Sequence, residues 1–270
     1  MSPEAPAASF ARPEGGRLRD RVAIVTGGGR GIGRAIALGL AAEGATVAVL
    51  SRSEEELNSV VADAVDLGGG GLALVVDCMD GQALKRAVEE ARERLGRLDV
   101  LVNNVGGLIG EVEKLAALDH DDELFERNLF LNLTTAYYAS RAALPHMVAG
   151  GYGRVVNIGS GYANHGGGMI AYSAAKHGLV GFTRALSYQV PAQVTVNCLC
   201  PGWTDTALLN WGGSDGAASA SAKAGVQTVQ GRVLEPRELA TFEALSRSNY
   251  SFECCAWSAS EQSVRRDRSC

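Results

Sequence analysis

Short runs of apolar, often β-branched residues alternate along the chain with segments in which apolar residues recur every three or four positions. The runs predict buried strands, and the recurring positions predict helices with one apolar face. The predicted strands span 22–26, 46–51, 72–77, 98–104, 154–160 and 193–200. The predicted helices lie near 31–43, 53–66, 81–95, 121–149 and 171–189. Almost continuously apolar strands separated by helices are typical of a doubly wound α/β fold, in which one parallel sheet carries helices on both faces.

The N-terminal end of the chain differs from this pattern. Residues 1–19 are rich in Pro, Ala, Ser and Gly and lack the apolar segment of an export signal, which predicts a flexible arm. We expect one folded domain over 20–240. No window approaches about eighteen uninterrupted apolar residues. We therefore expect no membrane contact and a cytoplasmic protein.

Composition narrows the class of protein. With 270 residues, of which 46% are hydrophobic and 20% charged, the chain suits one well-buried domain better than two. Thirty acidic and twenty-five basic residues give a net charge of −5, without a block of Lys and Arg. This balance argues against nucleic acid as a partner. The six cysteines lack the spacing of a zinc site, so we expect buried free thiols and no metal.

A glycine-rich turn, TGGGRGIG at 26–33, follows the first predicted strand and opens the first predicted helix. Glycines let backbone N–H groups and the positive end of a helix approach a pyrophosphate without Cβ atoms in the way. The turn predicts dinucleotide binding through Gly27, Gly31 and Gly33. Their spacing matches neither G-x-G-x-x-G nor a P-loop, so a tight turn without a ligand remains the alternative at this point.

Three later motifs occur in order: NNVG at 103–106, Ser160 followed by YSAAK at 172–176, and PGWTDT at 201–206. Tyr172 and Lys176 are four positions apart in a predicted helix, so their side chains lie on one face. A neighbouring ammonium group favours a phenolate, and lowering a tyrosine pKa of about 10 by about three units takes about 4 kcal/mol. We therefore expect Lys176 to lower the pKa of Tyr172.

Together with the glycine turn, these motifs resemble the short-chain dehydrogenase/reductase family from about residue 17 to about residue 240. The resemblance implies a Rossmann-like fold and hydride transfer between a nicotinamide cofactor and a small-molecule substrate. It also implies that Ser160 orients the substrate oxygen, that Tyr172 exchanges the proton, and that Lys176 holds the nicotinamide ribose. The spacing from Ser160 to Tyr172 is one residue shorter than is usual in the family, which leaves details of the substrate pocket open.

The family also uses a helical asparagine whose backbone carbonyl holds a water. The run NLTTAYYASRAALPHM at 132–147 resembles the family's sequence from that asparagine onward, which assigns the role to Asn132. Asn128 lies one turn earlier on the same face, and we expect it to be a polar surface or turn-facing residue.

The second predicted strand favours NADP(H) as the cofactor. An NAD site of this type usually ends that strand with an acidic residue for the ribose 2′-hydroxyl, whereas here Ser51 and Arg52 occupy the position. Arg30 lies in the glycine turn, and two guanidinium groups suit a 2′-phosphate. The nearest acids have a structural explanation, since Ser53 and Glu56 form the pattern of a capping box.

The resemblance adds further residues to both sites. For the cofactor these are Ile32, Asp77, Asn104, Gly106, Pro201, Gly202 and Thr206, together with Tyr172 and Lys176. For the substrate they are Tyr162, His165, Trp203, Leu208 and Trp211, with residues 207–230 as a lid whose Gly, Ser and Ala content suits a mobile segment. The lack of an Arg or Lys cluster there favours a ring or a medium acyl chain over a sugar phosphate.

We expect an NADPH-dependent reductase that converts a ketone or other carbonyl to a secondary alcohol. Two alternatives remain open from the sequence. One is an NAD-dependent alcohol dehydrogenase acting on a polyol, a sugar or a steroid. The other is a catalytically idle relative that binds a dinucleotide as a sensor or scaffold, although the presence of Ser160, Tyr172 and Lys176 argues against it.

The resemblance ends near residue 240. Residues 241–270 diverge and lack the glycines with which the family closes its last turn and strand. We expect six secure strands, a weak or missing seventh strand within 252–259, and a disordered tail from about Gln262. Because the family uses this region in a subunit interface, we expect a homo-oligomer, a dimer or tetramer, of reduced stability.

Overall fold

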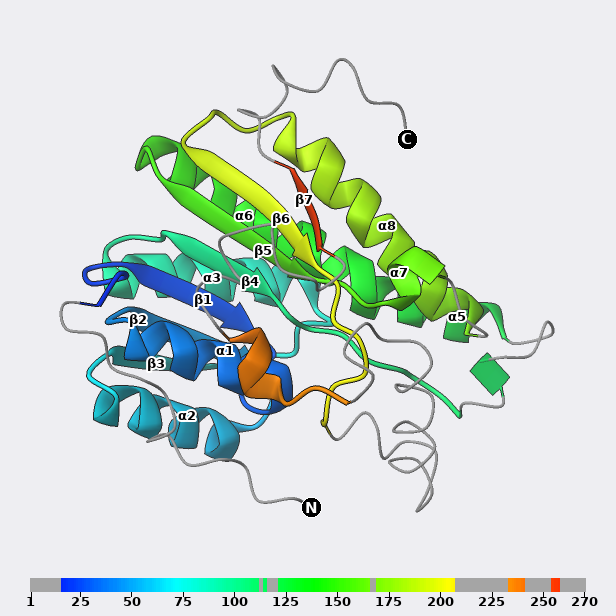
Figure 1. The fold of residues 1–270 in the computed structure, drawn as a ribbon, viewed down its shortest axis with the longest axis horizontal. Coiled ribbons are helices and arrows are strands. Elements are labelled where there is room, and N and C mark those ends of the chain that lie inside the picture. The colour runs from blue at the N-terminus through cyan, green and yellow to red at the C-terminus, as the bar shows by residue number, and fades with distance from the viewer. Residues whose placement is uncertain are drawn as a thin grey trace.

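The computed structural model describes residues 16–111, 114–115, 121–165, 169–206, 233–240 and 254–257 (Figure 1). The strands are β1 (Val22–Thr26), β2 (Thr46–Ser51), β3 (Gly70–Val75), β4 (Val100–Asn103), β5 (Gly153–Ile158), β6 (Val194–Leu199) and β7 (Cys254–Trp257). The helices are α1 (Gly31–Ala42), α2 (Glu54–Asp66), α3 (Gly81–Leu95), α5 (Asp122–Leu129), α6 (Thr135–Ala149), α7 (Tyr162–His165) and α8 (Ile170–Ser187). A π-helical turn, η2 (Phe130–Thr134), joins α5 to α6, and a 3-10 turn, η4 (Pro236–Leu239), packs near α1.

The strands form one sheet in the order β3-β2-β1-β4-β5-β6-β7. Strands β1 to β6 are parallel, and β7 pairs antiparallel with β6. Apolar residues of α1, α2 and η4 pack on one face of the sheet, and those of α3 and α6 pack on the other. The predicted doubly wound α/β fold is therefore confirmed. Among the described helices, none is long and apolar enough to cross a membrane.

The last four residues of the predicted flexible arm, 16–19, are packed against the fold, so the arm prediction is wrong for them. Leu18 is buried, and its backbone N–H donates to the carbonyl of Glu43 at 2.9 Å. Arg17 and Glu43 add an ion pair beside this contact. Residues 16–19 therefore lie against the connection between α1 and β2.

The glycine run before β3 has a packing role that the sequence did not reveal. Gly70 and Gly71 precede the predicted strand 72–77, but they belong to β3 and pair with Thr46 and Val47 of β2. A Cβ at Gly71 would lie 2.7 Å from Cγ1 of Val61 on α2. The glycines allow α2 to pack closely on the start of this strand.

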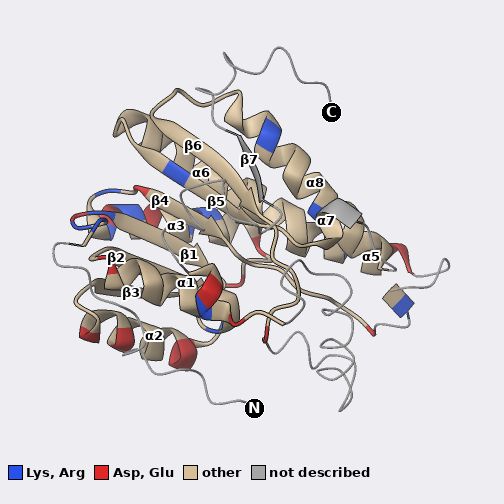
Figure 2. Ribbon diagram, in the orientation of Figure 1, with Lys and Arg blue, Asp and Glu red and all other residues tan. Residues whose placement is uncertain are grey.

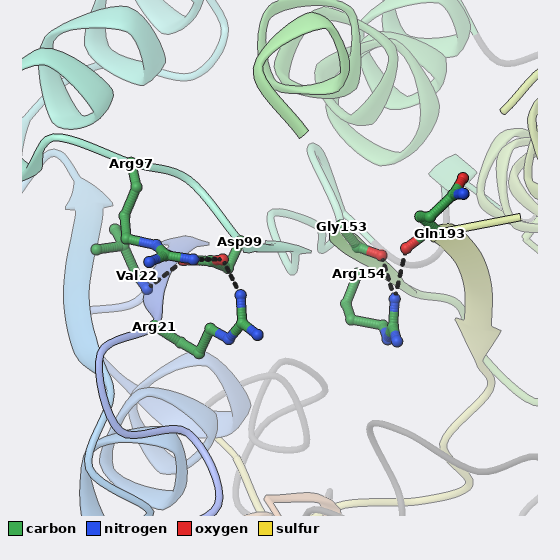
Figure 3. A network of polar contacts seen from close by, with 7 residues as sticks. All are labelled: Arg21, Val22, Arg97, Asp99, Gly153, Arg154 and Gln193. Carbon is green, nitrogen blue, oxygen red and sulfur yellow. Dashed lines mark hydrogen bonds and ion pairs between the residues drawn. The ribbon is translucent and has the colours of Figure 1, made fainter. Parts of the chain in front are cut away.

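Asp99, which precedes β4, holds strands together at the end of the sheet opposite the strand carboxyl ends (Figure 3). Its buried carboxylate accepts hydrogen bonds from Val22 N at 2.9 Å, from Arg97 at 2.7 Å and from Arg21 at 2.8 Å. Burial alone would raise the pKa of Asp99, but these hydrogen bonds hold the pKa below its usual value. The network ties β1 to β4 at the end of the sheet remote from the glycine turn.

The seventh strand lies inside the segment where the sequence allowed a short strand. Its four residues pair with Val196–Leu199 of β6. The residues on either side of β7, including those from Gln262 onward, lie outside the described part of the chain.

Candidate active site

The carboxyl ends of β1, β2, β4, β5 and β6 carry most of the residues that were expected to act (Figure 1). Strand β1 has β2 on one side and β4 on the other, so the chain connections run in opposite directions from this point. Ligands of open α/β sheets bind in the crevice at such a reversal. The fold therefore brings the predicted cofactor residues and the predicted catalytic residues to one edge of the sheet.

The glycine turn has the backbone conformation that its residues allow. Gly27 and Gly31 have φ values of +63° and +55°, which residues with a Cβ rarely adopt. A Cβ at Gly33 would lie 2.2 Å from the carbonyl oxygen of Gly27. The Asn104 side chain holds the turn by donating to the carbonyls of Thr26 and Gly27 at 3.1 and 3.0 Å. Close approach of α1 to β1 thus depends on these glycines.

The start of α1 suits an anion. Arg30 at its N-cap position provides no side-chain hydrogen bond to the first turn, and the first turn contains no acidic residue. The positive end of the helix is therefore not neutralised by the helix's own residues. Phosphate groups bind at such helix starts, so the turn fits the pyrophosphate of a dinucleotide.

The end of β2 presents an unsatisfied polar atom. The Ser51 hydroxyl is buried and has no hydrogen-bond partner within the described residues. Arg52, the next residue, is exposed, and the Arg30 guanidinium lies 3.8 Å from the Glu56 carboxylate. A dinucleotide ribose with a 2′-substituent fits a site that combines a buried free hydroxyl with two cations.

The other predicted cofactor residues lie around these two strand ends. Asp77 follows β3, is exposed, and accepts a hydrogen bond from Met79 N at 2.9 Å. Ile32 is half-buried against the core on the α1 face. A Cβ at Gly31 would lie 3.4 Å from a methyl group of Thr206. The segment that begins at Pro201 therefore runs from the end of β6 back to the glycine turn.

Tyr172 and Ser160 come together from different elements. Tyr172 lies in the first turn of α8 and is 8% exposed, and its side chain hydrogen-bonds to the Ser160 hydroxyl just after β5. Ser160 also accepts a hydrogen bond from Tyr162 N at 3.2 Å. Burial raises the pKa of Tyr172, and the hydrogen bond to Ser160 opposes this only in part. Tyr172 is therefore protonated at neutral pH in this structure.

Lys176 lies one helical turn after Tyr172 and is buried. Its Nζ donates to the carbonyl of Ile158 at 2.8 Å and lies 5.7 Å from the centre of the Tyr172 ring. Burial lowers the pKa of Lys176 to about 8. The net shift of the Tyr172 pKa in this structure is upward and not downward as expected, because burial of the phenol dominates.

Asn132 is held in the π-helical turn between α5 and α6. Its Oδ1 accepts from Gly107 N at 3.0 Å, and its Nδ2 donates to the Gly107 carbonyl at 2.9 Å. A Cβ at Gly106 would lie 3.0 Å from Asn132 Oδ1 and 3.1 Å from Lys176 Nζ. Asn132 and Lys176 therefore both lie beside Gly106. The expected role of the Asn132 backbone carbonyl in holding a water stays a prediction.

Asn128 repeats the same interaction one turn earlier, and the sequence missed it. Of the two expected positions, surface or turn-facing, the surface position is wrong, since Asn128 is 0% exposed. Its side chain accepts from Ile109 N at 3.0 Å and donates to the Ile109 carbonyl at 2.9 Å. Two asparagines thus pair with alternate residues of the segment after β4, and their spacing of four was the signal for it.

The predicted substrate residues are described only in part. The ring of Tyr162 on α7 lies 5.8 Å from the Tyr172 ring and 6.4 Å from the Trp203 ring, both in edge-to-face geometry. The structure thus places the Tyr162 ring beside Tyr172 and the Trp203 ring beside Tyr162. The His165 side chain, Leu208, Trp211 and the predicted lid at 207–230 lie outside the described residues.

Two thiols lie behind the site on β6 and the residue that follows it. Cys198 and Cys200 are buried thiols outside any disulfide, with their sulfurs 3.8 Å apart. A Cβ at Gly159 would lie 2.7 Å from the Cys200 sulfur. Cys78 is also buried and outside any disulfide, so the expectation of buried thiols without disulfides is confirmed for these three residues.

Comparisons with known proteins agree with this geometry. The family model for short chain dehydrogenases matches residues 21–215. The chain is 36% identical over 242 residues to the short-chain reductase protein NovJ of Streptomyces niveus, covering 86% of this chain and 90% of NovJ. It is 37% identical over 191 residues to the 3-oxoacyl-(acyl-carrier-protein) reductase FabG of Haemophilus influenzae, covering 70% and 76%. The crystal structure of a blue fluorescent protein from a metagenomic library, in complex with NADPH, matches with a TM-score of 0.72 and 33% identity, covering 83% and 88%.

Proposed function

The chain belongs to the short-chain dehydrogenase/reductase family of NAD(P)-dependent oxidoreductases, and we propose that it uses NADPH to reduce a ketone or other carbonyl to a secondary alcohol. The observation that carries this proposal is the meeting of Ser160, Tyr172 and Lys176 at the edge of the sheet that holds the glycine turn. The names of NovJ and FabG, both reductases, support the reductive direction.

The protein's own residues would bind and protonate the substrate. When bound, the cofactor supplies the hydride that reaches the carbonyl carbon. The hydroxyls of Ser160 and Tyr172 hydrogen-bond the carbonyl oxygen, and Tyr172 donates its proton to that oxygen as the alcohol forms. The raised pKa of Tyr172 keeps this proton in place at neutral pH. The Lys176 ammonium, 5.7 Å from the ring centre, then stabilises the phenolate that remains.

The choice of NADPH is supported by the cations near Ser51. Arg30 and Arg52 lie where a 2′-phosphate is expected, and no carboxylate ends β2. Arg52→Asp tests this choice, because a carboxylate at this position repels a phosphate and can accept a hydrogen bond from a ribose hydroxyl. We expect Arg52→Asp to weaken NADPH binding more than NADH binding. Equal kcat/KM for the two cofactors in the unmodified enzyme would count against the choice.

The substrate is proposed to be a small molecule with a ring or a medium acyl chain. The Tyr162 ring beside Tyr172, with the Trp203 ring packed edge-to-face on Tyr162, supports an apolar wall. Turnover of a panel of cyclic ketones, 3-oxoacyl thioesters and sugar ketones with NADPH tests this class. Absence of turnover on the whole panel, with NADPH still bound, would favour the catalytically idle alternative.

We also propose that the enzyme works in the cytoplasm as a homo-oligomer. An apolar groove of about 550 Å³ between α6 and α8 supports association, since exposed apolar surfaces of this kind mark protein contacts. Sizing of the purified protein tests the oligomer, and cell fractionation tests the compartment.

A further inference from the structure

Glu56 lies closer to the expected cofactor than its place in the sequence suggested. A Cβ added at Gly29 in the glycine turn would lie 3.1 Å from Oε2 of Glu56 and 3.1 Å from the Ser51 hydroxyl oxygen. The carboxylate and the unpartnered hydroxyl therefore flank the same point of the turn. Glu56 is the first-turn acid of α2 that faces this point, because Glu54 and Glu55 are exposed on other sides of the helix.

The capping role expected for Glu56 explains the hydrogen bond of its backbone N–H but not the position of its carboxylate. Its N–H donates to the Ser53 hydroxyl at 3.4 Å, which is the N-cap half of a capping box. Its carboxylate lies instead toward the glycine turn, 3.8 Å from the Arg30 guanidinium. Arg30 is 69% exposed and Glu56 is 37% exposed, so solvent screens this ion pair and it adds little to stability. A role in stability therefore does not account for where the carboxylate lies.

We propose that Glu56 is a cofactor-specificity residue that limits the preference for NADPH and allows NADH to bind. The carboxylate flanks the end of β2, where an NAD site has its acid on the strand itself. As an acceptor it suits the ribose 2′-hydroxyl of NADH, and as an anion it opposes the 2′-phosphate of NADPH. By pairing with Arg30 it also offsets one of the two cations that a 2′-phosphate would use. The inference rests on the proposed function, which puts a dinucleotide at this turn.

Glu56→Gln tests the proposal because it removes the charge and keeps the length of the side chain and its backbone hydrogen bond. We expect the Kd for NADPH to fall about fivefold and the Kd for NADH to rise by a similar factor, measured by calorimetry without substrate. The ratio of kcat/KM between the two cofactors should move in the same direction. Glu55→Gln is the matched control, with the same change in charge on an exposed neighbour, and should leave both Kd values within twofold.

Two results would overturn the specificity role. One is an equal change, or no change, in the two Kd values of Glu56→Gln. The other is the same shift in Glu55→Gln, which would point to the charge of the helix as a whole. Measurements on the unmodified protein distinguish this from failure of the proposed function. A preference for NADH would remove the NADPH proposal but leave the change in the ratio of the two Kd values in Glu56→Gln testable. Binding of neither cofactor would overturn both proposals.

Discussion

Tyr172 combines burial with a hydrogen bond to Ser160, and both features suit a proton donor. Tyr172→Phe keeps the ring and removes the hydroxyl, so cofactor binding should stay within about twofold while the loss of proton transfer lowers kcat by about 10² to 10⁴-fold. Calorimetry with NADPH and steady-state kinetics measure the two effects. A variant with more than about a tenth of the original turnover would remove the proton-exchange role.

Burial of the Lys176 ammonium lowers the free energy of unfolding of the protein. Burial lowers its pKa from the usual 10.5 to about 8, so between these two pH values the unfolded chain binds more protons than the folded chain. The cost of the buried ammonium is therefore present in full below pH 8 and is relieved as the pH rises toward 10.5. Lys176→Met should lose turnover yet raise the free energy of unfolding at pH 7 by about 2 kcal/mol, after allowing for the unpaired Ile158 carbonyl.

Denaturant unfolding of both proteins at pH 7 and pH 10 measures this effect. The stability difference between Lys176→Met and the unmodified chain should shrink at the higher pH, because the lysine of the folded protein is neutral there. A difference that grows with pH, or a variant that is less stable at pH 7, would show that burial of Lys176 does not carry the cost.

At the scale of elements, the end of α5 and the π-helical turn η2 hold the segment that follows β4 in place. Asn128 and Asn132 each pair with both backbone groups of one residue in that segment. Asn128→Ala would leave the N–H and carbonyl of Ile109 unpaired, and we expect a loss of about 3 kcal/mol in the free energy of unfolding. Asn58→Ala, on the exposed face of α2, is the control and should change stability by less than about 0.5 kcal/mol. Similar losses in the two variants would show that Asn128 has no special role.

The region around η2 also shows how much of the fold and of the site the sequence predicts. Strands β1 and β2 and helix α3 match their predicted bounds, and the ends of α1, α2 and α8 differ by one or two residues, because apolar periodicity is a local property. The π-helical turn inside the predicted helix 121–149 could not be predicted, since it depends on Asn132 pairing with a distant segment. The motifs identified Ser160, Tyr172 and Lys176, but the protonation of Tyr172 depends on burial that only the packed fold defines.

At the scale of the whole molecule, charge and apolar surface are separated. Figure 2 shows acidic residues on α2 and basic residues near the N-terminal ends of β1 and β4, whereas the ribbon of α6 is mostly uncharged. The groove between α6 and α8 is lined mostly by apolar residues, with Arg141 among the polar ones, and its lining residues Tyr137 and Val148 are 40% and 46% exposed. Large side chains of this kind are costly to leave in water, which makes this face the expected contact between subunits.

Val148→Glu tests that contact, because a charge buried between subunits without a partner opposes association. We expect the unmodified protein to elute as a dimer at micromolar concentration and Val148→Glu to elute as a monomer with unchanged NADPH binding. Val65→Glu, at an exposed apolar position on α2 away from the groove, is the control and should remain a dimer. Because residues 241–270 diverge from the family, we expect no tetramer that persists on dilution. Light scattering over a hundredfold dilution measures both expectations, and a persistent tetramer, or a dimeric Val148→Glu, would refute the corresponding one.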